Sequence, residues 1–495
     1  MMRWWQRASA VSGAAVAATV PLWGLQLPPL IDLLGHIGRY HIQLGIADNP
    51  ALAANWVFRW HWLGNLGGDL LMEPLGRLFG VERGGIVLAA IILVVMISGM
   101  AQLARAVHGA MPATLWAAFP FAMAYPWQYG LVNYWLGVGL AFHATAWVWR
   151  MAPTRRRTAL IGVLSLLLWT AHIYGWAVFA VLIGARALAQ TTWRTWLHLP
   201  LQFWTLATPL APMLLIGYGA RGAQETYGWF LWTRKLDALH WTLRDQWEAL
   251  DVVTLAAALV LIGWGLRSRF MRFDRALGIA SALLLLAVAI VPFQLLGSAF
   301  ADGRLWPVVF VVALLAMRPT DDAPPLLSPA IATVAAALFA VRIAATTIGF
   351  QAYDVDYARH LKALDHVARG SRIAVFVEFP CKVSWRRLRL DHLDSLAIVR
   401  RDAFTNGQWD VPGAQLLTPL GAVGTRFNAD PSQLVRRPDC PADLRPVLAQ
   451  RIAAFPRDRF DYVWAIGFDP ATLPRYAALT PLFEDDRTIL YRIEK

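Results

Sequence analysis

The chain has 495 residues, of which 57% are hydrophobic and only 16% are charged. This apolar surface exceeds what the core of one soluble protein needs, so the composition excludes an ordinary cytosolic enzyme and indicates a membrane protein. The formal charge of +13 fits arginine-rich cytoplasmic loops, and we expect the lipid bilayer, not nucleic acid, as the partner.

The first apolar run, residues 8–26, follows Arg3 and Arg7, and we interpret it as a retained membrane span instead of a cleaved signal peptide. Further apolar runs cover residues 86–104, 112–125, 131–149, 199–217, 250–266, 277–296, 305–317 and 331–350. The stretch 158–188 is either one helix about 46 Å long or two short helices that break near His172.

The positive-inside rule favours two helices in that stretch, because the arginine-rich turns then lie on the side of the N-terminus. These arginines are Arg105, Arg150, Arg155, Arg156, Arg157, Arg186, Arg194, Arg267, Arg269, Arg272, Arg275 and Arg318. The sequence therefore predicts a polytopic α-helical protein of the bacterial inner membrane, with about eleven spans. Its N-terminus is cytoplasmic and its C-terminus periplasmic.

The first extracytoplasmic loop, residues 27–83, is long and contains regularly spaced tryptophans. Trp56, Trp60 and Leu63 recur at helical spacing beside Arg59 and His61, which predicts a helix lying flat in the membrane interface. The tryptophans among mixed charges in residues 225–248 give the same prediction for that segment.

The composition changes after residue 350, where long apolar runs stop and charged residues and prolines rise. We therefore expect a transmembrane domain over residues 1–350 and a soluble periplasmic domain over 351–495. In the second domain, residues 357–368 have helical spacing, residues 372–379 and 462–466 are typical of strands, and residues 479–493 predict two strands around a turn. This is a small α/β or α+β fold.

Both cysteines of the chain, Cys381 and Cys440, fall in the predicted soluble domain. One disulfide in an oxidising compartment is one interpretation, and two buried free thiols is the other. The domain has no paired-cysteine metal spacing and no Gly-rich phosphate loop.

Polar residues gather at the extracytoplasmic ends of the predicted spans, although a charge near hydrocarbon costs at least about 2.5–3.5 kcal/mol. Asp32, His36 and Arg39 lie four and three residues apart and so share one helical face. There a carboxylate can act as a general base or bind a divalent cation, while an arginine or histidine holds a phosphate oxygen. The alternative is a surface network that caps an interfacial helix.

Three further turns place polar side chains on the same side of the membrane. These residues are Asn133, Tyr134, His172, Tyr174, Asp302 and Arg304. The planar fork of Arg304 matches phosphate oxygens, although snorkelling to ordinary phospholipid would also explain it. His172 is either a packed histidine at a helix end or a site residue. Arg342, inside the last span, either binds a lipid phosphate or snorkels.

Together these features resemble the GT-C glycosyltransferases, and most closely the bacterial members that use polyprenyl-phosphate sugars. The resemblance covers the whole architecture through short motifs. They are an acidic residue after the first span, a long first loop, many short spans, a terminal periplasmic domain, and an arginine before the proline of a late span (Asp302-Gly-Arg304-Leu-Trp-Pro307).

The resemblance implies a membrane enzyme of the cell envelope, a transferase that moves a sugar from a polyprenyl-phosphate donor to an extracytoplasmic acceptor. By the same resemblance Asp32 would be the catalytic base, with His36 as a second catalytic residue, and Arg304 would hold the donor phosphate. The other polar residues would contact substrate, namely Arg39, Asn133, Tyr134, His172, Tyr174 and Asp302. The pattern names no cofactor and leaves a divalent cation open.

Two other classes of function stay open at this level. A transporter or flippase of a lipid-linked glycan or small solute would use the broken helix near His172 as its site. A non-catalytic membrane assembly protein would act through the soluble domain. The lack of an inverted repeat in the hydropathy and the large terminal domain disfavour the transporter.

Overall fold

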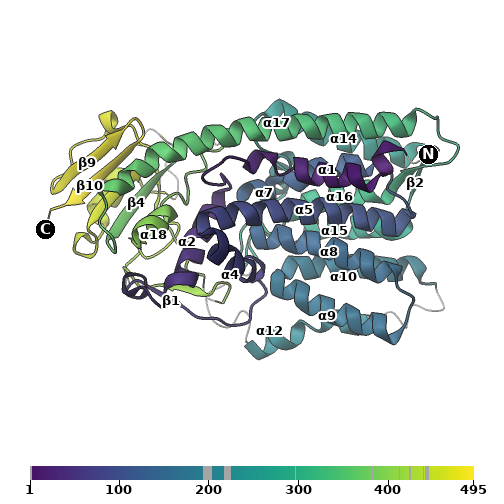
Figure 1. Cartoon of the computed structure of the whole chain (residues 1–495), viewed down its shortest axis with the longest axis horizontal. Coiled ribbons are helices and arrows are strands. Elements are labelled where there is room, and N and C mark those ends of the chain that lie inside the picture. Colours follow the sequence, from purple (N-terminus) through teal and green to yellow (C-terminus); the bar gives the residue numbers. More distant parts are fainter. Residues whose placement is uncertain are drawn as a thin grey trace. The chain divides into compact units, whose positions relative to one another are not determined.

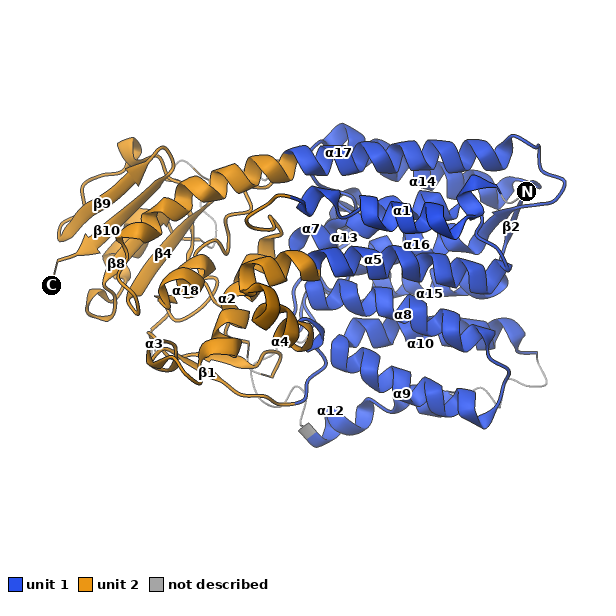
Figure 2. Cartoon of the chain, in the orientation of Figure 1, with its two compact units in different colours: residues 1–23, 62–68, 89–348 blue, residues 24–61, 69–88, 349–495 orange. Residues whose placement is uncertain are grey.

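The computed structural model describes residues 3–192, 203–216, 225–295, 297–380, 384–411, 413–422, 425–438, 440 and 445–494. The chain divides into two compact units (Figure 2). Unit 1 comprises residues 1–23, 62–68 and 89–348, and unit 2 comprises residues 24–61, 69–88 and 349–495. Most of the first loop thus groups with the C-terminal residues. The two domains expected from the sequence, 1–350 and 351–495, stay a prediction.

Unit 1 is a bundle of helices (Figure 1). Its described helices include α1 (Ala8–Ala17), α6 (Leu115–Ala118), α7 (Tyr125–Tyr129), α8 (Val132–Arg150), α9 (Arg155–Ala171), α10 (Ile173–Gln190), α12 (Leu210–Ile216), α13 (Trp232–His240), α14 (Glu248–Arg267), α15 (Arg275–Ile290) and α16 (Trp306–Ala316). Most of α5 (Val81–His108) and of α17 (Leu327–Leu361) also belongs to unit 1.

Four described helices are long and apolar enough to cross a membrane: α5, α10, α14 and α17 with its extension to His366. Shorter apolar helices cover Ala8–Leu22, Trp204–Leu215, Arg275–Ile290 and Gly303–Ala316. The predicted class of helical membrane protein is confirmed, while the count of about eleven spans stays a prediction.

The predicted break near His172 is confirmed. His172 has an extended backbone, with φ −169° and ψ 136°, between the end of α9 and the start of α10. Its Nδ1 accepts a hydrogen bond from the backbone N–H of Tyr174 at 3.1 Å, which caps α10. α10 also lies close to α8, because a Cβ on Gly175 would be only 2.8 Å from the backbone of Gly137. The break therefore sits at a tight helix crossing.

The apolar run 112–125 does not form the single span that the sequence predicts. Its described residues form α6, the 3-10 helix η3 (Phe119–Met123) and the start of α7. Pro120 and Pro126 each stand in the first turn of a new piece. Proline lacks the N–H that a continuing helix needs and is tolerated at a helix start, so the run breaks into short pieces.

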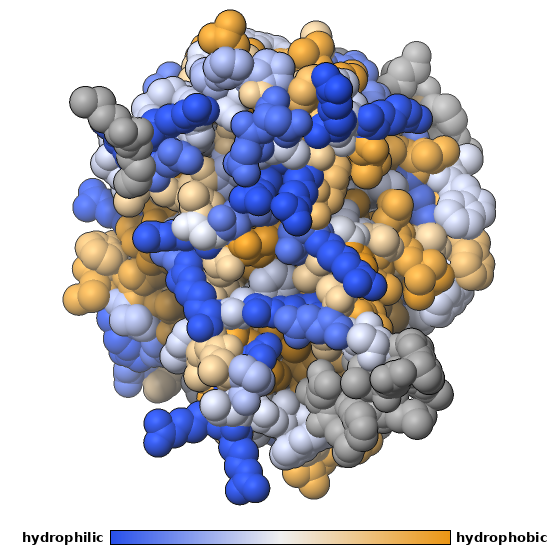
Figure 3. All heavy atoms as spheres, turned by 90° about the vertical axis from the view of Figure 1, so that its right-hand side faces the viewer, coloured by the Kyte–Doolittle hydropathy of each residue, from blue (hydrophilic) through white to orange (hydrophobic). Residues whose placement is uncertain are grey.

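The arginine-rich turns gather at one end of unit 1. Strands β2 (Met271–Phe273) and β3 (Met317–Pro319) pair there, with Arg272 opposite Arg318. Arg150 at the end of α8 donates to the carbonyl of Gln102 in α5 at 3.0 Å. Figure 3 shows hydrophilic side chains spread over this end. The clustering agrees with the positive-inside pattern, and the orientation in the membrane stays a prediction.

The charged residue in the last predicted span is paired inside the protein. Arg342 of α17 contacts the carboxylate of Asp251 in α14 at 2.6 Å, and both side chains are at most 2% exposed. Arg342 also donates to the carbonyls of Met123 and Leu243, at 3.1 and 2.7 Å. Arg342 therefore neither snorkels nor faces lipid, and both interpretations from the sequence are wrong.

Unit 2 is built around a mixed sheet with the strand order β5-β4-β8-β10-β9, in which β7 also pairs with β4. The strands are β4 (Arg372–Phe379), β5 (Phe404–Thr405), β7 (Leu434–Arg436), β8 (Tyr462–Ile466), β9 (Leu479–Asp485) and β10 (Thr488–Ile493). β4 runs parallel to β5, β7 and β8, whereas β10 runs antiparallel to β8 and β9. The strands predicted from the sequence are confirmed, as is the mixed α and β character.

The segment around Trp56 is a strand, so the helix predicted there is wrong. β1 (Trp56–Phe58) pairs antiparallel with β6 (Leu417–Pro419). Trp56 is 1% exposed, whereas Trp60 is 49% exposed. Pairing with a distant segment overrides the local spacing. In residues 225–248, by contrast, α13 is helical as predicted, and its place in the membrane interface stays a prediction.

Cys440 is disulfide-bonded, which excludes a free thiol at this position. Cys381, the other cysteine of the chain, lies outside the described residues.

Candidate functional site

The face predicted to carry Asp32, His36 and Arg39 belongs to helix α2 (Ile31–Gly45) of unit 2. α2 packs against α18 (Ser395–Arg401) and the loop that follows it. A Cβ on Gly35 would lie 2.5 Å from the ring of Trp409, so only glycine permits this approach. The helical spacing of the three residues is confirmed, and each contacts a different set of partners.

Asp32 lies beside a histidine that sequence analysis did not single out. Its Oδ1 is 3.9 Å from Nε2 of His392, and the side chains are 18% and 6% exposed. The other ring nitrogen of His392 lies 3.2 Å from the carbonyl of Gly407. The ring also lies 4.4 Å from that of Trp409, measured between centroids. The partly exposed carboxylate of Asp32 therefore lies next to the imidazole of His392, whose orientation is fixed by its contacts with Gly407 and Trp409.

Carboxylates surround His392. Burial alone would lower the pKa of His392, but the carboxylates of Asp430, Asp32, Asp394 and Asp391 outweigh it and hold that pKa above its usual value. Burial raises the pKa of Asp394 to about 6, and burial likewise raises that of Asp430. His392 therefore presents positive charge beside the Asp32 carboxylate.

His36 lies partly buried on the same face of α2. Burial, with the positive charges of Arg39 and His392, lowers its pKa well below the usual value. Its ring lies 4.9 Å from that of Trp409, and its Nδ1 has no hydrogen-bond partner among the described residues. His36 is therefore a neutral imidazole at neutral pH.

Arg39 is neutralised by a buried carboxylate. Its Nη1 lies 2.9 Å from Oδ1 of Asp69 in α4 (Gly67–Phe79), and the two side chains are 1% and 0% exposed. Gln43, one turn further along α2, donates to the backbone carbonyl of Asp69 at 3.0 Å. The geometry joins α2 to α4 and supports a positioning role for Arg39.

The predicted residues of unit 1 lie together at the end away from the arginine-rich turns. The rings of Tyr134, His172 and Tyr174 contact one another, with centroids 5.5 to 5.7 Å apart. The hydroxyl of Tyr134 donates to the carbonyl of Arg304 at 2.6 Å, and that of Tyr174 donates to the carbonyl of Ala301 at 3.0 Å. Three turns that are distant in sequence therefore form one cluster.

Arg304 is the cation of this cluster. Its side chain is 8% exposed, and its Nη2 donates to the carbonyl of Ala299 at 2.8 Å. Its Nε is buried without a hydrogen-bond partner, and no described carboxylate forms an ion pair with it. The neighbouring Asp302 is bound instead to Lys235 of α13, with Nζ and Oδ2 2.7 Å apart. A nearly buried guanidinium without a counter-ion is suited to an anionic ligand.

The side-chain amide of Asn133 forms hydrogen bonds to the segment 62–68 through both its nitrogen and its oxygen. Its Nδ2 donates to the backbone and side-chain oxygens of Asn65, at 2.8 and 2.9 Å. Its Oδ1 accepts from the N–H of Gly68. These bonds point to a structural role within unit 1.

Sequence reasoning missed Asp69, His392, Trp409 and Lys235. The run Asp391-His392-Leu-Asp394 was a usable signal, because it concentrates titratable groups before an apolar helix. Nothing local marks Asp69 as the partner of Arg39. No group of three or more His, Cys, Asp or Glu side chains in the described part of the chain is arranged to hold a metal ion.

The helical unit with candidate spans and the mixed-sheet unit define a polytopic membrane protein with an attached α/β domain. No family model matches the sequence, and no curated protein is similar to it. Two solved structures of ArnT from Cupriavidus metallidurans are similar in fold, one in the apo state and one bound to undecaprenyl phosphate.

The apo ArnT structure has a TM-score of 0.53 and 14% identity, and the lipid-bound one has 0.51 and 13%. Each comparison covers 97% of this chain and 96% of ArnT. At this level of identity the likeness is one of fold, and it extends over nearly the whole chain.

Proposed function

We propose that this protein transfers a sugar from a polyprenyl-phosphate donor to an acceptor hydroxyl on the extracytoplasmic face of the bacterial inner membrane. The observation that carries the proposal is the uncompensated guanidinium of Arg304 in a chain with the fold of ArnT, which was solved with undecaprenyl phosphate bound.

In the proposed reaction the acceptor oxygen bonds to the anomeric carbon, and the bond from that carbon to the phosphate oxygen breaks. The polyprenyl phosphate leaves with an additional negative charge, which Arg304 offsets. The acceptor proton passes to the carboxylate of Asp32, whose Oδ1 lies 3.9 Å from Nε2 of His392.

The remaining candidates divide by their contacts. His36 is a neutral, partly buried imidazole on the same helix as the base and is assigned a catalytic role with it. Tyr134 and Tyr174 donate to the loop that carries Arg304, and the His172 ring packs against both tyrosine rings. Arg39, Asn133 and Asp302 are held by protein partners and act as positioning residues.

The experiment follows the release of polyprenyl phosphate by mass spectrometry, in membranes containing the full chain and a polyprenyl-phosphate-linked sugar. Asp32→Asn should retain binding of undecaprenyl phosphate in native mass spectrometry and lower the rate of polyprenyl phosphate release by at least about 100-fold, the lower range for general-base catalysis. Arg304→Gln should lose lipid binding. Arg156→Gln, an exposed arginine of the opposite end of unit 1, is the control and should change neither.

Lipid binding without any sugar release by the unaltered protein would favour the transporter alternative. Unchanged release in Asp32→Asn would remove Asp32 from the catalytic role. Loss of function only on altering the soluble domain would favour an assembly protein.

A further inference from the structure

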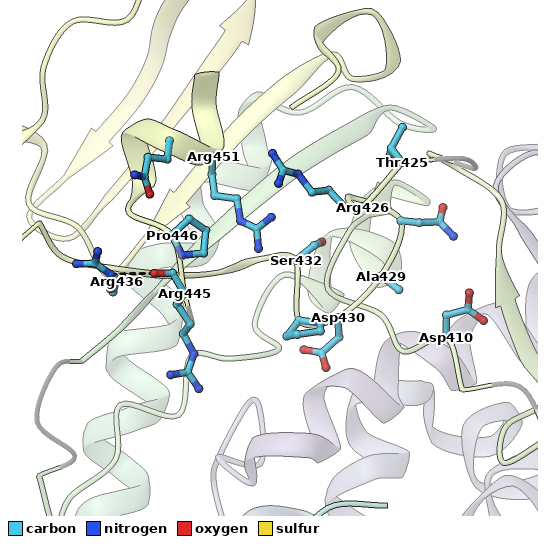
Figure 4. Close-up of a pocket in the computed structure, with 13 residues that line it drawn as sticks. Asp410, Thr425, Arg426, Ala429, Asp430, Ser432, Arg436, Arg445, Pro446 and Arg451 are labelled. Carbon is cyan, nitrogen blue, oxygen red and sulfur yellow. Dashed lines mark hydrogen bonds between the residues drawn. The ribbon is translucent and has the colours of Figure 1, made fainter. Parts of the chain in front are cut away.

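A cavity of about 810 Å³ lies within unit 2, on the side of the sheet where β7 ends and α19 (Leu448–Ala454) begins. Its charged lining consists of Arg426, Arg436, Arg445, Arg451, Asp410 and Asp430 (Figure 4). A cavity of this size is in the range that holds small molecules of sugar-phosphate size. The four arginines belong neither to the α2 face nor to the Arg304 cluster, whereas Asp430 is also one of the carboxylates near His392.

Two of the arginines are engaged in holding the walls. Arg436, at the end of β7, donates through Nε to the carbonyl of Arg445 at 2.8 Å and through Nη1 to the carbonyl of Cys440 at 2.9 Å. The guanidinium of Arg445 lies 3.7 Å from the centre of the Phe379 ring. These contacts fix the rim of the cavity.

The other two arginines converge on the cavity from different segments. The guanidinium groups of Arg426 and Arg451 lie 5.6 and 5.3 Å from the centre of the Phe427 ring, so one aromatic side chain supports both. Neither guanidinium forms an ion pair or hydrogen bond with a described residue, and Nε of Arg451 is buried. Figure 4 shows both head groups on the cavity side.

The two positive charges oppose each other in the absence of a ligand. Burial lowers the pKa of Arg451, and the charge of Arg426 lowers it further. The carboxylates of the lining form no ion pair with Arg426 or Arg451, so they do not offset the repulsion between the two guanidinium groups. Asp430 accepts instead from Gln433 at 2.6 Å, and burial raises the pKa values of Asp430 and Asp410. A bound dianion would remove the repulsion between the two guanidinium groups and take their free donors.

We propose that this cavity is a binding site for the phosphate group of a sugar-sized phosphate ester, with Arg426 and Arg451 holding the phosphate. The proposal does not rest on the proposed transfer reaction, because Arg426 and Arg451 take no part in that reaction. Its ligand could be a soluble sugar phosphate or the phosphate headgroup of a lipid, because both present the same dianion.

The test uses the full chain in nanodiscs of phosphatidylcholine and measures binding of glucose 6-phosphate by isothermal titration calorimetry. We expect saturable binding of glucose 6-phosphate and none of glucose. Arg451→Gln and Arg426→Gln should each weaken binding roughly tenfold or more, the effect of losing one charge-assisted hydrogen bond. Arg426 is exposed, so Arg426→Gln stays informative if Arg451→Gln fails to fold.

Arg475→Gln is the matched control, because Arg475 is an exposed arginine of the same unit outside the cavity lining. Nanodiscs that also contain phosphatidic acid separate the two sources. Loss of glucose 6-phosphate binding in them indicates a lipid headgroup, and unchanged binding indicates a soluble ligand. Absence of binding to either phosphate compound, or equal weakening in Arg475→Gln, would overturn the proposal.

Discussion

Arg39 and Asp69 form a salt bridge of 2.9 Å that is closed to solvent on both sides. In the protein interior the two charges are tolerated only as a pair, because either charge alone would be buried without an opposite charge. The pair joins α2, which carries Asp32, to α4. The position of the proposed base therefore depends on a contact seven residues further along its own helix.

Asp69→Asn should destabilise the protein by about 3–5 kcal/mol, the usual cost of breaking a buried pair from one side. Thermal unfolding of the detergent-purified chain measures this. Arg77→Ala on the same helix is the control, because Arg77 is 64% exposed in its pair with Glu73 and its loss should change stability by less than about 1 kcal/mol. Equal effects of the two substitutions would contradict the assignment.

Asp394→Asn should change how stability depends on pH. Burial raises the folded-state pKa of Asp394 from 3.8 to about 6, so the folded protein binds more protons than the unfolded chain between these values. The contribution of Asp394 is present in full below about pH 4 and is lost as the pH rises through about 6.

Because asparagine does not titrate, the stability of Asp394→Asn relative to the unaltered protein should increase across this interval, by at most about 3 kcal/mol. Unfolding temperatures measured at intervals from pH 4 to pH 7 test this, and a constant difference between the two proteins would refute it.

Local pattern predicted much of the fold. The β-branched run 372–379 became β4 with the expected bounds, because a strand buried on both faces needs a continuous apolar run. The break at His172 was predictable from length and charge together. The prolines in 112–125 also indicated that this run is not one helix. The prediction of a single span instead followed the apolar composition of the run.

Contacts between distant segments could not be predicted in this way. Trp56 has helical spacing with Trp60 but pairs as a strand with β6, which no local property of either segment shows. The assignment of Arg342 failed for the same reason, since its partner Asp251 lies on another helix. In the candidate site, the shared face of α2 followed from spacing, whereas His392 beside Asp32 is a consequence of the tertiary fold.

Arg342→Lys should destabilise the protein although it keeps the charge. The fork of Arg342 serves Asp251 and two backbone carbonyls at once, and one ammonium group cannot reproduce this planar arrangement. We expect a loss of about 2 kcal/mol, the range for a buried acceptor left unsatisfied. Arg267→Lys at the exposed end of α14 should have no measurable effect on the unfolding temperature, and an equal loss there would contradict the argument.

Gly35→Ala tests the packing that brings α2 to the proposed site. The added Cβ would lie 2.5 Å from Cη2 of Trp409 and 3.2 Å from Cγ of His392, so the indole must move. We expect a loss of about 1–3 kcal/mol, as for other overpacked cores, and a reduced rate of sugar release because His392 shifts from Asp32. Gly13→Ala in α1 is the matched control, since nothing lies within 4 Å of its Cβ and the better helix propensity of alanine should leave stability equal or higher. Restoration of both properties in Gly35→Ala/Trp409→Phe would assign the defect to this contact, whereas a stable and fully active Gly35→Ala would show that the close approach of α2 is not required.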